Sequence, residues 1–359
     1  MAGRPSGSWP RGPAARRGPR SRPPNADTTR AGARGPQPLP RGEEVLSAMA
    51  RLGDSDLDVF PICLGGNVFG WTADRDRSFE VLDAYVAAGG NFVDTADVYS
   101  AFAEGNAGGE SEAVLGEWLR ARGNRDRIVI ATKVGMWDRR PGLGAENIRA
   151  AAEDSLRRLG TDHIDLYYAH RDDERTPLEE TLAAFDELVR SGKVRHIAAS
   201  NYTAPRLAEA LEVSKREGFA RFTALQPHYN LVERAEFEGE PAGLAERENL
   251  AVLPYFALAK GFLTGKYRPG DASSESPRAE RARAYLDERG VKVLAALDEI
   301  ATLRDLPVAS VALAWLLGKR NVTAPIASAR NTEQLSALLP AAESALTDAE
   351  VERLDEASA

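Results

Sequence analysis

The sequence predicts an α/β protein folded as a single (β/α)8 (TIM) barrel domain, and three observations lead to this prediction. Short apolar or β-branched runs alternate with helical patterns eight times between residue 59 and the C-terminus. The strand runs are almost continuously apolar, which is typical of parallel strands covered on both faces. No Gly-x-Gly-x-x-Gly fingerprint follows a strand, so an open dinucleotide-binding sheet is the weaker alternative.

Residues that start or stop helices bound the first four strand–helix units. Three of the predicted helices end at glycine, at Gly89-Gly90, Gly123 and Gly160, where a left-handed backbone closes the last turn. In chain order we expect strand 60–65 with helix 75–88, strand 91–96 with helix 111–122, strand 128–133 with helix 145–159, and strand 164–169 with helix 176–190.

The second half repeats this scheme, with a long loop between the seventh strand and its helix. We expect strand 194–199 with helix 204–216, strand 223–226 with helix 242–249, strand 251–255 with helix 291–303, and strand 322–326 with a last helix from residue 332.

Residues 1–48 are predicted to be a disordered extension, and residues 49–359 the barrel domain. The first 42 residues are rich in Arg, Pro, Gly and Ala and contain few apolar side chains beyond Trp9, so they cannot bury enough surface to order themselves. An organelle transit peptide is disfavoured because Pro and Gly would break its amphipathic helix. A translation start at Met49 is the other reading of this boundary.

Composition excludes several classes of function. The formal net charge is −8 although residues 1–42 contain nine Arg and one Asp, so the barrel is strongly acidic and nucleic-acid binding is not expected. Cys63 is the only cysteine, so we expect neither an internal disulfide nor a bound metal. No apolar run approaches the roughly 18 residues of a membrane span, and no secretory signal is present. We therefore expect a cytoplasmic protein with no membrane partner, as a monomer or weak homo-oligomer.

Polar residues interrupt the apolar runs at the carboxyl ends of strands, where barrel enzymes carry their active sites. Lys133 ends a strand that reads Ile-Val-Ile-Ala-Thr-Lys, so its buried ammonium group needs a carboxylate, and Asp94 ends the preceding strand. Tyr99 lies five residues beyond Asp94, and a cation beside its phenol would lower the phenol pKa toward values useful for general acid catalysis. His170 follows the fourth strand and can hydrogen-bond the same substrate oxygen.

These residues resemble the catalytic tetrad of the aldo-keto reductases. Asp94 lies within Phe-Val-Asp-Thr-Ala-Asp-Val-Tyr and His170 within Asp-Leu-Tyr-Tyr-Ala-His, and the similarity runs from about residue 52 to the C-terminus. Stretch 255–267 is similar to the branch that includes many bacterial oxidoreductases and the potassium-channel β-subunits. The resemblance implies NADPH-dependent reduction of a small-molecule aldehyde or ketone to the alcohol, or the reverse. Tyr99 would donate the proton, Lys133 and Asp94 would tune Tyr99, and His170 would orient the carbonyl.

The resemblance also implies the residues that hold the nicotinamide end of NADP(H). Ser200, Asn201 and Gln226 would hydrogen-bond the carboxamide, and Tyr255 would stack on the ring. The structural alternative is that Ser200 and Asn201 cap the helix that begins at Ala204.

The rest of the cofactor is expected to lie on two segments. By resemblance, the pyrophosphate is held by a loop that contains Phe256, Leu258, Gly261 and Lys266. The adenosine 2′-phosphate and adenine are held after the eighth strand by Ser328, Arg330 and Gln334. A bidentate contact of Arg330 with the 2′-phosphate favours NADP over NAD. The family often has a Glu-Asn pair for adenine where this chain has Ala337-Leu338, so the adenine contacts depart from its pattern.

Two other functions remain open from the sequence. One is an NADP(H)-sensing regulatory protein of the same fold with little turnover; the other is a barrel hydrolase or lyase that uses Asp94 and His170 without nucleotide. The second leaves Lys133 and the loop at Gly261 unexplained. Trp71 and Trp137, each shortly after a strand end, are hypothesised to line an apolar substrate wall.

Overall fold

The computed structural model describes residues 49–270 and 279–359, and every described element lies in one compact unit. The extension predicted for residues 1–48 lies outside the described residues. The described chain begins at Met49 and leads directly into the short strand β1 (Ala50–Arg51).

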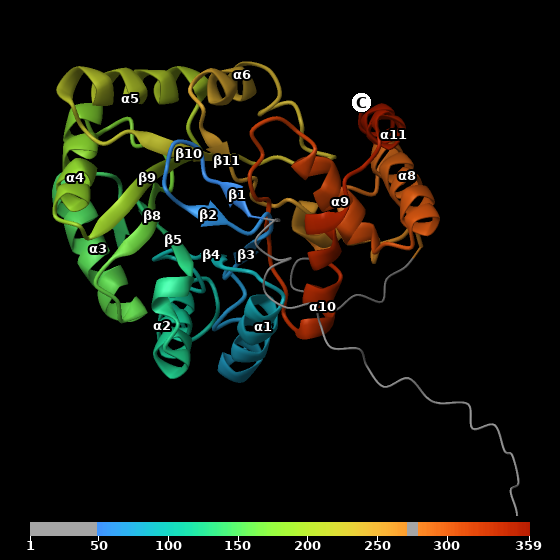
Figure 1. Ribbon diagram of the computed structural model, residues 1–359, viewed down its shortest axis with the longest axis horizontal. Coiled ribbons are helices and arrows are strands. Elements are labelled where there is room, and N and C mark those ends of the chain that lie inside the picture. Colours follow the sequence, from blue (N-terminus) through green and yellow to red (C-terminus); the bar gives the residue numbers. More distant parts are fainter. Residues whose placement is uncertain (1–48, 271–278) are drawn as a thin grey trace, which may run out of the picture. The chain divides into compact units, whose positions relative to one another are not determined.

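Eight parallel strands form the central sheet, and each pairs with its neighbour in chain order. They are β3 (Cys63–Gly65), β4 (Phe92–Asp94), β5 (Val129–Val134), β8 (Ile164–Ala169), β9 (Val194–Ser200), β10 (Phe222–Gln226), β11 (Ala251–Val252) and β12 (Ile326–Ala327). β12 pairs with β3, and a parallel bridge joins Val252 of β11 to Val322. The Ile326 N–H also donates to the Pro254 carbonyl at 2.9 Å. The sheet therefore curls round on itself as a barrel (Figure 1), and the predicted fold class is confirmed.

Helices surround these strands (Figure 1), and consecutive helices from α1 to α6 pack on one another. They are α1 (Arg75–Ala87), α2 (Glu110–Arg122), α3 (Ala145–Leu159), α4 (Leu178–Arg190), α5 (Ala204–Glu217) and α6 (Glu240–Arg247). The side chains of Asp74 and Thr203 cap α1 and α5, and glycines in the left-handed conformation end α2 and α3 at Gly123 and Gly160. The predicted helix boundaries in this half follow from those capping residues.

The C-terminal part contains more helices than the sequence predicted. The expected helix 291–303 corresponds to α8 (Glu288–Arg304), but a second helix, α9 (Val308–Leu317), follows before β12. α9 reads Val-Ala-Ser-Val-Ala-Leu-Ala-Trp-Leu-Leu and is buried along nearly its whole length, so it has no polar face to give a helical period. Further helices are α7 (Ala279–Arg283), α10 (Thr332–Ser336) and α11 (Asp348–Ser358); α10 packs on α1, and α11 packs on α8.

A short antiparallel hairpin that the sequence analysis did not predict closes one end of the barrel. It is formed by β1 and β2 (Asp58–Val59). Leu52, Leu57 and Val59 join Cys63 in the hydrophobic cluster of the barrel interior. That cluster is separate from the larger one between strands and helices. The hairpin therefore forms a floor at the amino ends of the strands, and the opposite end is left as the mouth.

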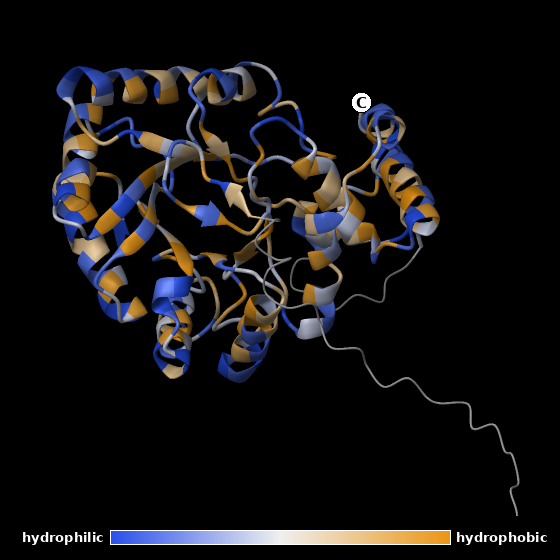
Figure 2. Cartoon of the chain, in the orientation of Figure 1, coloured by the Kyte–Doolittle hydropathy of each residue, from blue (hydrophilic) through white to orange (hydrophobic). Residues whose placement is uncertain are grey.

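The distribution of hydropathy agrees with this layered core. Figure 2 shows apolar residues concentrated on the strands, with polar residues on the outer surfaces of the surrounding helices. None of the described helices is by itself long and apolar enough to cross a membrane; only α8 and α9 together, with a 98° bend between them, meet such criteria of length and composition.

Candidate active site

The four tetrad residues predicted from the sequence lie together at the mouth of the barrel. Asp94 is the last residue of β4, Lys133 lies near the end of β5, and His170 directly follows β8. These three strands are neighbours in the sheet, with Asp94 paired to Ala131 and Lys133 paired to Tyr168. Tyr99 lies on the loop between β4 and α2, five residues after Asp94.

The Lys133 ammonium group is the centre of the cluster. Its Nζ is fully buried and donates to Asp94 Oδ1 at 2.5 Å, to the Thr95 carbonyl at 2.8 Å and to the Tyr99 hydroxyl at 2.9 Å. All three ammonium protons therefore have acceptors, which is the condition for keeping such a charge inside a protein. The Tyr99 hydroxyl also lies 3.3 Å from Asp94 Oδ1, so the carboxylate contacts both partners.

Burial shapes the protonation of this site. Burial lowers the pKa of Lys133, and the negative charge of Asp94 and its hydrogen bond oppose that shift. Burial also lowers the pKa of His170 well below its usual value, and the charges of Lys133 and Arg171 lower it further. His170 is therefore a neutral imidazole near pH 7. Its Nδ1 is buried and has no hydrogen-bond partner among the described residues, and its ring lies 6.1 Å from that of Tyr99.

The four residues expected to hold the nicotinamide form one hydrogen-bonded chain beside the tetrad. The Asn201 amide donates to the His170 carbonyl at 2.9 Å, and Tyr255 donates to Asn201 Oδ1 at 2.8 Å. Ser200 donates to the Gln226 carbonyl at 3.0 Å, and the Gln226 amide donates to Asp94 Oδ2 at 3.1 Å. Gln226 thus contacts the tetrad directly, which the sequence analysis did not anticipate.

Thr203 accepts the capping hydrogen bond of α5, so the structural alternative for Ser200 and Asn201 as helix caps is wrong. Asn201 instead has a positive φ of 55°, a conformation that turns its amide back toward His170.

The predicted pyrophosphate loop has an unusual backbone. Phe256, Ala259 and Lys260 have positive φ values of 50°, 47° and 59°, and Gly261 follows at 97°. The turn η3 (Ala259–Thr264) is broken at Lys260 and Gly261 for this reason. Such strain in non-glycine residues costs on the order of 1 kcal/mol or more each and is concentrated at functional sites. A Cβ added to Gly261 would come within 3.3 Å of the Lys266 Nζ, so the backbone and this ammonium group approach closely.

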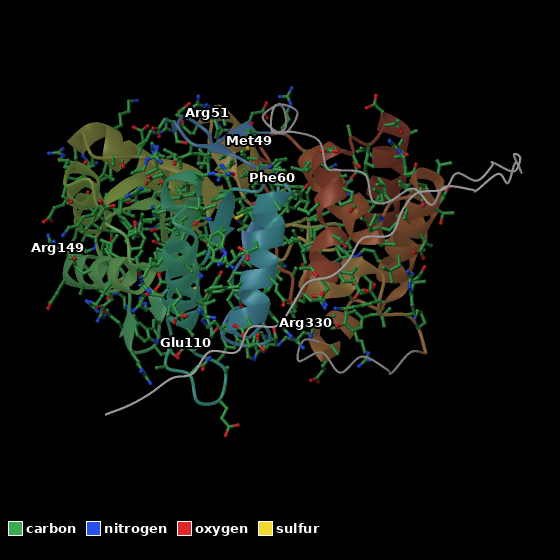
Figure 3. The ribbon with its side chains drawn as sticks, turned by 60° about the horizontal axis from the view of Figure 1, so that its bottom comes forward. Met49, Arg51, Phe60, Glu110, Arg149 and Arg330 are labelled. Atoms are coloured by element: carbon green, nitrogen blue, oxygen red, sulfur yellow. The ribbon has the colours of Figure 1, made fainter. Side chains whose placement is uncertain are left out.

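The segment after β12 is held to the barrel by side-chain contacts. Ser328 donates to Asn67 Oδ1 at 2.8 Å, and the Arg330 N–H donates to Gln334 Oε1 at 3.0 Å. Asn331 caps α10 by accepting from the Gln334 N–H. Figure 3 shows Arg330 and Glu110 at the end of the barrel opposite Met49 and Arg51, which places Arg330 on the mouth side.

Sequence reasoning missed several supporting residues. His228 stacks on Tyr255 with ring centroids 5.3 Å apart, Asn230 donates to the Phe256 carbonyl at 3.0 Å, and Asn67 accepts from Ser328. The polar run Gln-Pro-His-Tyr-Asn after β10 was the available signal for the first two. Among the described residues, no group of three or more His, Cys, Asp or Glu side chains is arranged to hold a metal ion.

A parallel barrel with a buried Lys–Asp pair and a tyrosine at its mouth defines the class of this protein. The Aldo/keto reductase family matches residues 61–359, and the chain belongs to that family. It is therefore an oxidoreductase. The expected relation to the potassium-channel β-subunit branch stays a prediction.

Similar proteins come from bacteria and fungi. The chain is 36% identical to the uncharacterized oxidoreductase YrpG of Bacillus subtilis, over 84% of this chain and 93% of the relative. It is 33% identical to the norsolorinic acid reductase stcV of Emericella nidulans, over 83% and 78%. It is 29% identical to the aryl-alcohol dehydrogenase GME11368 of Pestalotiopsis microspora, again over 83% and 78%.

Proposed function

We propose that this protein interconverts a carbonyl compound and its alcohol with NADP(H), and that Tyr99 is the general acid. The observation that carries the proposal is the 2.9 Å contact between Lys133 Nζ and the Tyr99 hydroxyl, with Asp94 Oδ1 2.5 Å from the same ammonium group. A fixed cation beside a phenol stabilises the phenolate that is left when the proton moves to substrate. Burial lowers the pKa of Lys133, and the charge and hydrogen bond of Asp94 oppose that shift and so favour the charged ammonium form.

His170 would fix the carbonyl oxygen beside Tyr99. As a neutral imidazole it can donate one hydrogen bond without competing with Tyr99 for the role of acid. The Asn201 amide donates to the backbone carbonyl of His170. Asn201, which would also bind the carboxamide of the cofactor, therefore helps to fix the position of His170. Reduction would then require a proton from Tyr99 at the oxygen and a hydride at the carbon.

The residues at the mouth fit a phosphorylated dinucleotide. Among the described residues neither Lys266 nor Arg330 has a carboxylate partner: Lys266 lies over the Tyr267 ring, and the hydrogen bond of Arg330 is made by its backbone N–H. A cation with no counter-ion in the described part of the chain is suited to bind phosphate, and Lys266 also lies beside the loop of positive-φ backbone. Lys266 and the loop 256–261 would hold the pyrophosphate, Arg330 the 2′-phosphate, and Tyr255 the nicotinamide ring. When bound, NADP(H) supplies or accepts the hydride.

Aromatic carbonyl compounds and alcohols are the substrate class that we propose. Trp71 packs edge-on against Phe102 with centroids 4.7 Å apart, and the Phe102 side chain is 60% exposed. Trp137 lies on the loop hairpin formed by β6 (Met136–Trp137) and β7 (Arg140–Pro141) after β5. Two of the similar proteins are named for norsolorinic acid and for aryl alcohols, which supports this choice.

The test is the consumption of NADPH with aromatic and aliphatic aldehydes and ketones, for the wild type and Tyr99→Phe. We expect Tyr99→Phe to lose at least about 100-fold in kcat, in line with loss of a general acid, while the Kd for NADPH changes little. Tyr229→Phe is the matched control, because its hydroxyl bonds Glu238 outside the site. Tight NADPH binding without turnover on any carbonyl or alcohol would favour a nucleotide-sensing role, and absence of NADPH binding would refute both.

A further inference from the structure

Asp97 is a buried acid that the proposed chemistry leaves without a role. It lies between Asp94 and Tyr99 on the same loop and is only 1% exposed. Neither of its carboxyl oxygens has a hydrogen-bond partner of acceptable geometry among the described residues. A carboxylate buried in this way would be costly, because nothing replaces its lost hydration.

Its surroundings explain why no cation within residues 49–270 and 279–359 pairs with it. Glu112 of α2 accepts from Thr132 Oγ1 at 2.6 Å and from Arg158 Nε at 2.6 Å, so both of its oxygens are occupied. Arg158 of α3 is therefore committed to Glu112 rather than to Asp97. The remaining ionisable groups that face Asp97 are Lys133, which is held by Asp94, and the buried phenol of Tyr167.

These neighbours determine when Asp97 ionises. Burial and the charge of Glu112 raise the pKa of Asp97 to about 7, and Arg158, the nearby Val98 N–H and Lys133 oppose the shift only in part. Asp97 is therefore uncharged below about pH 7. Above that pH it carries a negative charge that is buried and has no partner among the described residues.

The loop that carries Asp97 is firmly attached on both sides of this residue and more weakly at Asp97 itself. The Asp97 N–H reaches the Lys133 carbonyl at 3.3 Å, which is a long contact, whereas Ser100 Oγ holds the Phe69 carbonyl at 2.7 Å. Thr95 is fixed by its N–H on the Ala131 carbonyl at 2.8 Å. Between these two firm anchors, segment 96–99 is held by the long Asp97 contact and by the contacts of the Tyr99 hydroxyl with Lys133 and Asp94.

We propose that Asp97 is a positioning residue that makes the placement of Tyr99 depend on pH. As a neutral acid, Asp97 packs the loop against α2 and α3 and keeps Tyr99 on Lys133; when it ionises, the loop shifts toward solvent and Tyr99 leaves the ammonium group. This inference rests on the proposed role of Tyr99, but the loop movement itself can be measured without turnover.

The kinetic test compares the pH profiles of the wild type, Asp97→Asn and Glu104→Gln. Asn stays neutral at every pH, and Glu104 is an exposed acid on the same loop, so its replacement controls for removal of a charge. About nine-tenths of Asp97 is ionised one pH unit above its pKa. We expect kcat in the wild type and in Glu104→Gln to fall about 3- to 10-fold from pH 6 to pH 8, in excess of any fall in Asp97→Asn, while the Kd for NADPH stays constant. Identical profiles in all three proteins would overturn the proposal.

A structural test separates this inference from the proposed function. The infrared pH-difference spectrum should contain the carbonyl stretch of a protonated carboxylic acid that disappears near pH 7 in the wild type and is absent in Asp97→Asn. Trp71 contacts Phe102 of the same loop, so tryptophan fluorescence should titrate over the same range in the wild type and Glu104→Gln only. A wild type without the neutral-acid band refutes the proposal even if Asp97→Asn does not fold. Both transitions present in a protein without turnover would refute the catalytic role of Tyr99 and leave the switch intact.

Discussion

The Lys133 side chain combines two properties that rarely occur together, complete burial and a positive charge. Each of its protons has an acceptor, and one of these acceptors is the Tyr99 hydroxyl. Replacement of Asp94 would leave the ammonium group without its counter-ion, and breaking a buried pair in this way is more costly than never forming it. In our proposal the pair acts electrostatically on Tyr99, and its contact also joins the strands β4 and β5.

The choice between NADP and NAD depends on Arg330 in our proposal. Arg330→Met removes the cation that would face the 2′-phosphate, and a charge-assisted hydrogen bond contributes about 1.5–3 kcal/mol. We expect the Kd for NADPH to rise about 10- to 100-fold and the Kd for NADH to change less than about threefold. Isothermal titration calorimetry with both nucleotides measures this, and Arg77→Met on the exposed surface of α1 is the control. An equal loss for both nucleotides would contradict a 2′-phosphate contact.

The clustering of Asp94, Lys133 and His170 was open to prediction because they lie at or beside the ends of successive apolar strands, where parallel topology brings polar side chains together; Tyr99 follows on the loop after Asp94. The contact of Gln226 with Asp94 was not, because it depends on the closure of the barrel, which brings β10 across from β4. The special environment of Asp97 could not be predicted from the sequence for another reason. It lies inside a motif whose neighbours carry the resemblance, and its isolation follows only from the pairing of Arg158 with Glu112.

Among the elements, α2 and α3 approach each other most closely at a glycine. A Cβ at Gly116 would lie 2.2 Å from the Arg158 carbonyl oxygen and 2.8 Å from the Leu159 carbonyl, so the backbones leave no room for a side chain. This contact also sets the position of Arg158, which reaches Glu112 next to Asp97. The helix pair therefore supports the loop that carries Tyr99.

Gly116→Ala should lower the free energy of unfolding by about 1–3 kcal/mol, because the helices must separate to admit the methyl group. The usual gain of about 1 kcal/mol from replacing a helical glycine cannot compensate for this overlap. Gly243→Ala in α6 is the matched control, since its nearest neighbour is the end of the Arg247 side chain at 3.2 Å. Urea unfolding of both variants tests the idea; equal effects would show that the α2–α3 approach is not tight in solution.

Element prediction succeeded where a helix had one polar face and a capping residue, as in α3, whose predicted and observed bounds coincide. It failed for α9, which is apolar on every side, and for the β1–β2 hairpin, whose strands of two residues are too short for a period to register. The hairpin is fixed by tertiary contacts of Leu52, Leu57 and Val59 with the barrel interior, and no local pattern encodes those contacts.

For the molecule as a whole, Asp97 should couple stability to pH. The native state holds this proton up to a pKa of about 7, whereas the unfolded chain releases it near 3.8, so unfolding is favoured progressively as the pH rises through that window. Stability contributed by the neutral acid is fully present below pH 3.8 and is lost by about pH 7. As the pH rises from 4 to 8, we expect the free energy of unfolding of Asp97→Asn to increase by up to about 4 kcal/mol relative to that of the wild type.

Urea unfolding at a series of pH values measures this difference directly. The Glu104→Gln variant should parallel the wild type across the range, because its carboxylate is exposed in the folded chain. Parallel curves for Asp97→Asn and wild type would mean that Asp97 finds a partner in solution.

The single cysteine of this chain allows its motions to be measured by thiol labelling. Cys63 lies in the closing strand β3 with no exposed surface, and burial raises the pKa of its thiol well above the usual value. Thiol-reactive dyes should therefore not react with Cys63 in the native barrel. They should label it only at the rate at which the barrel opens. A cysteine introduced at Glu104 would then be the sole labelling site under native conditions, and a fluorophore attached there would report the excursions of the loop one molecule at a time.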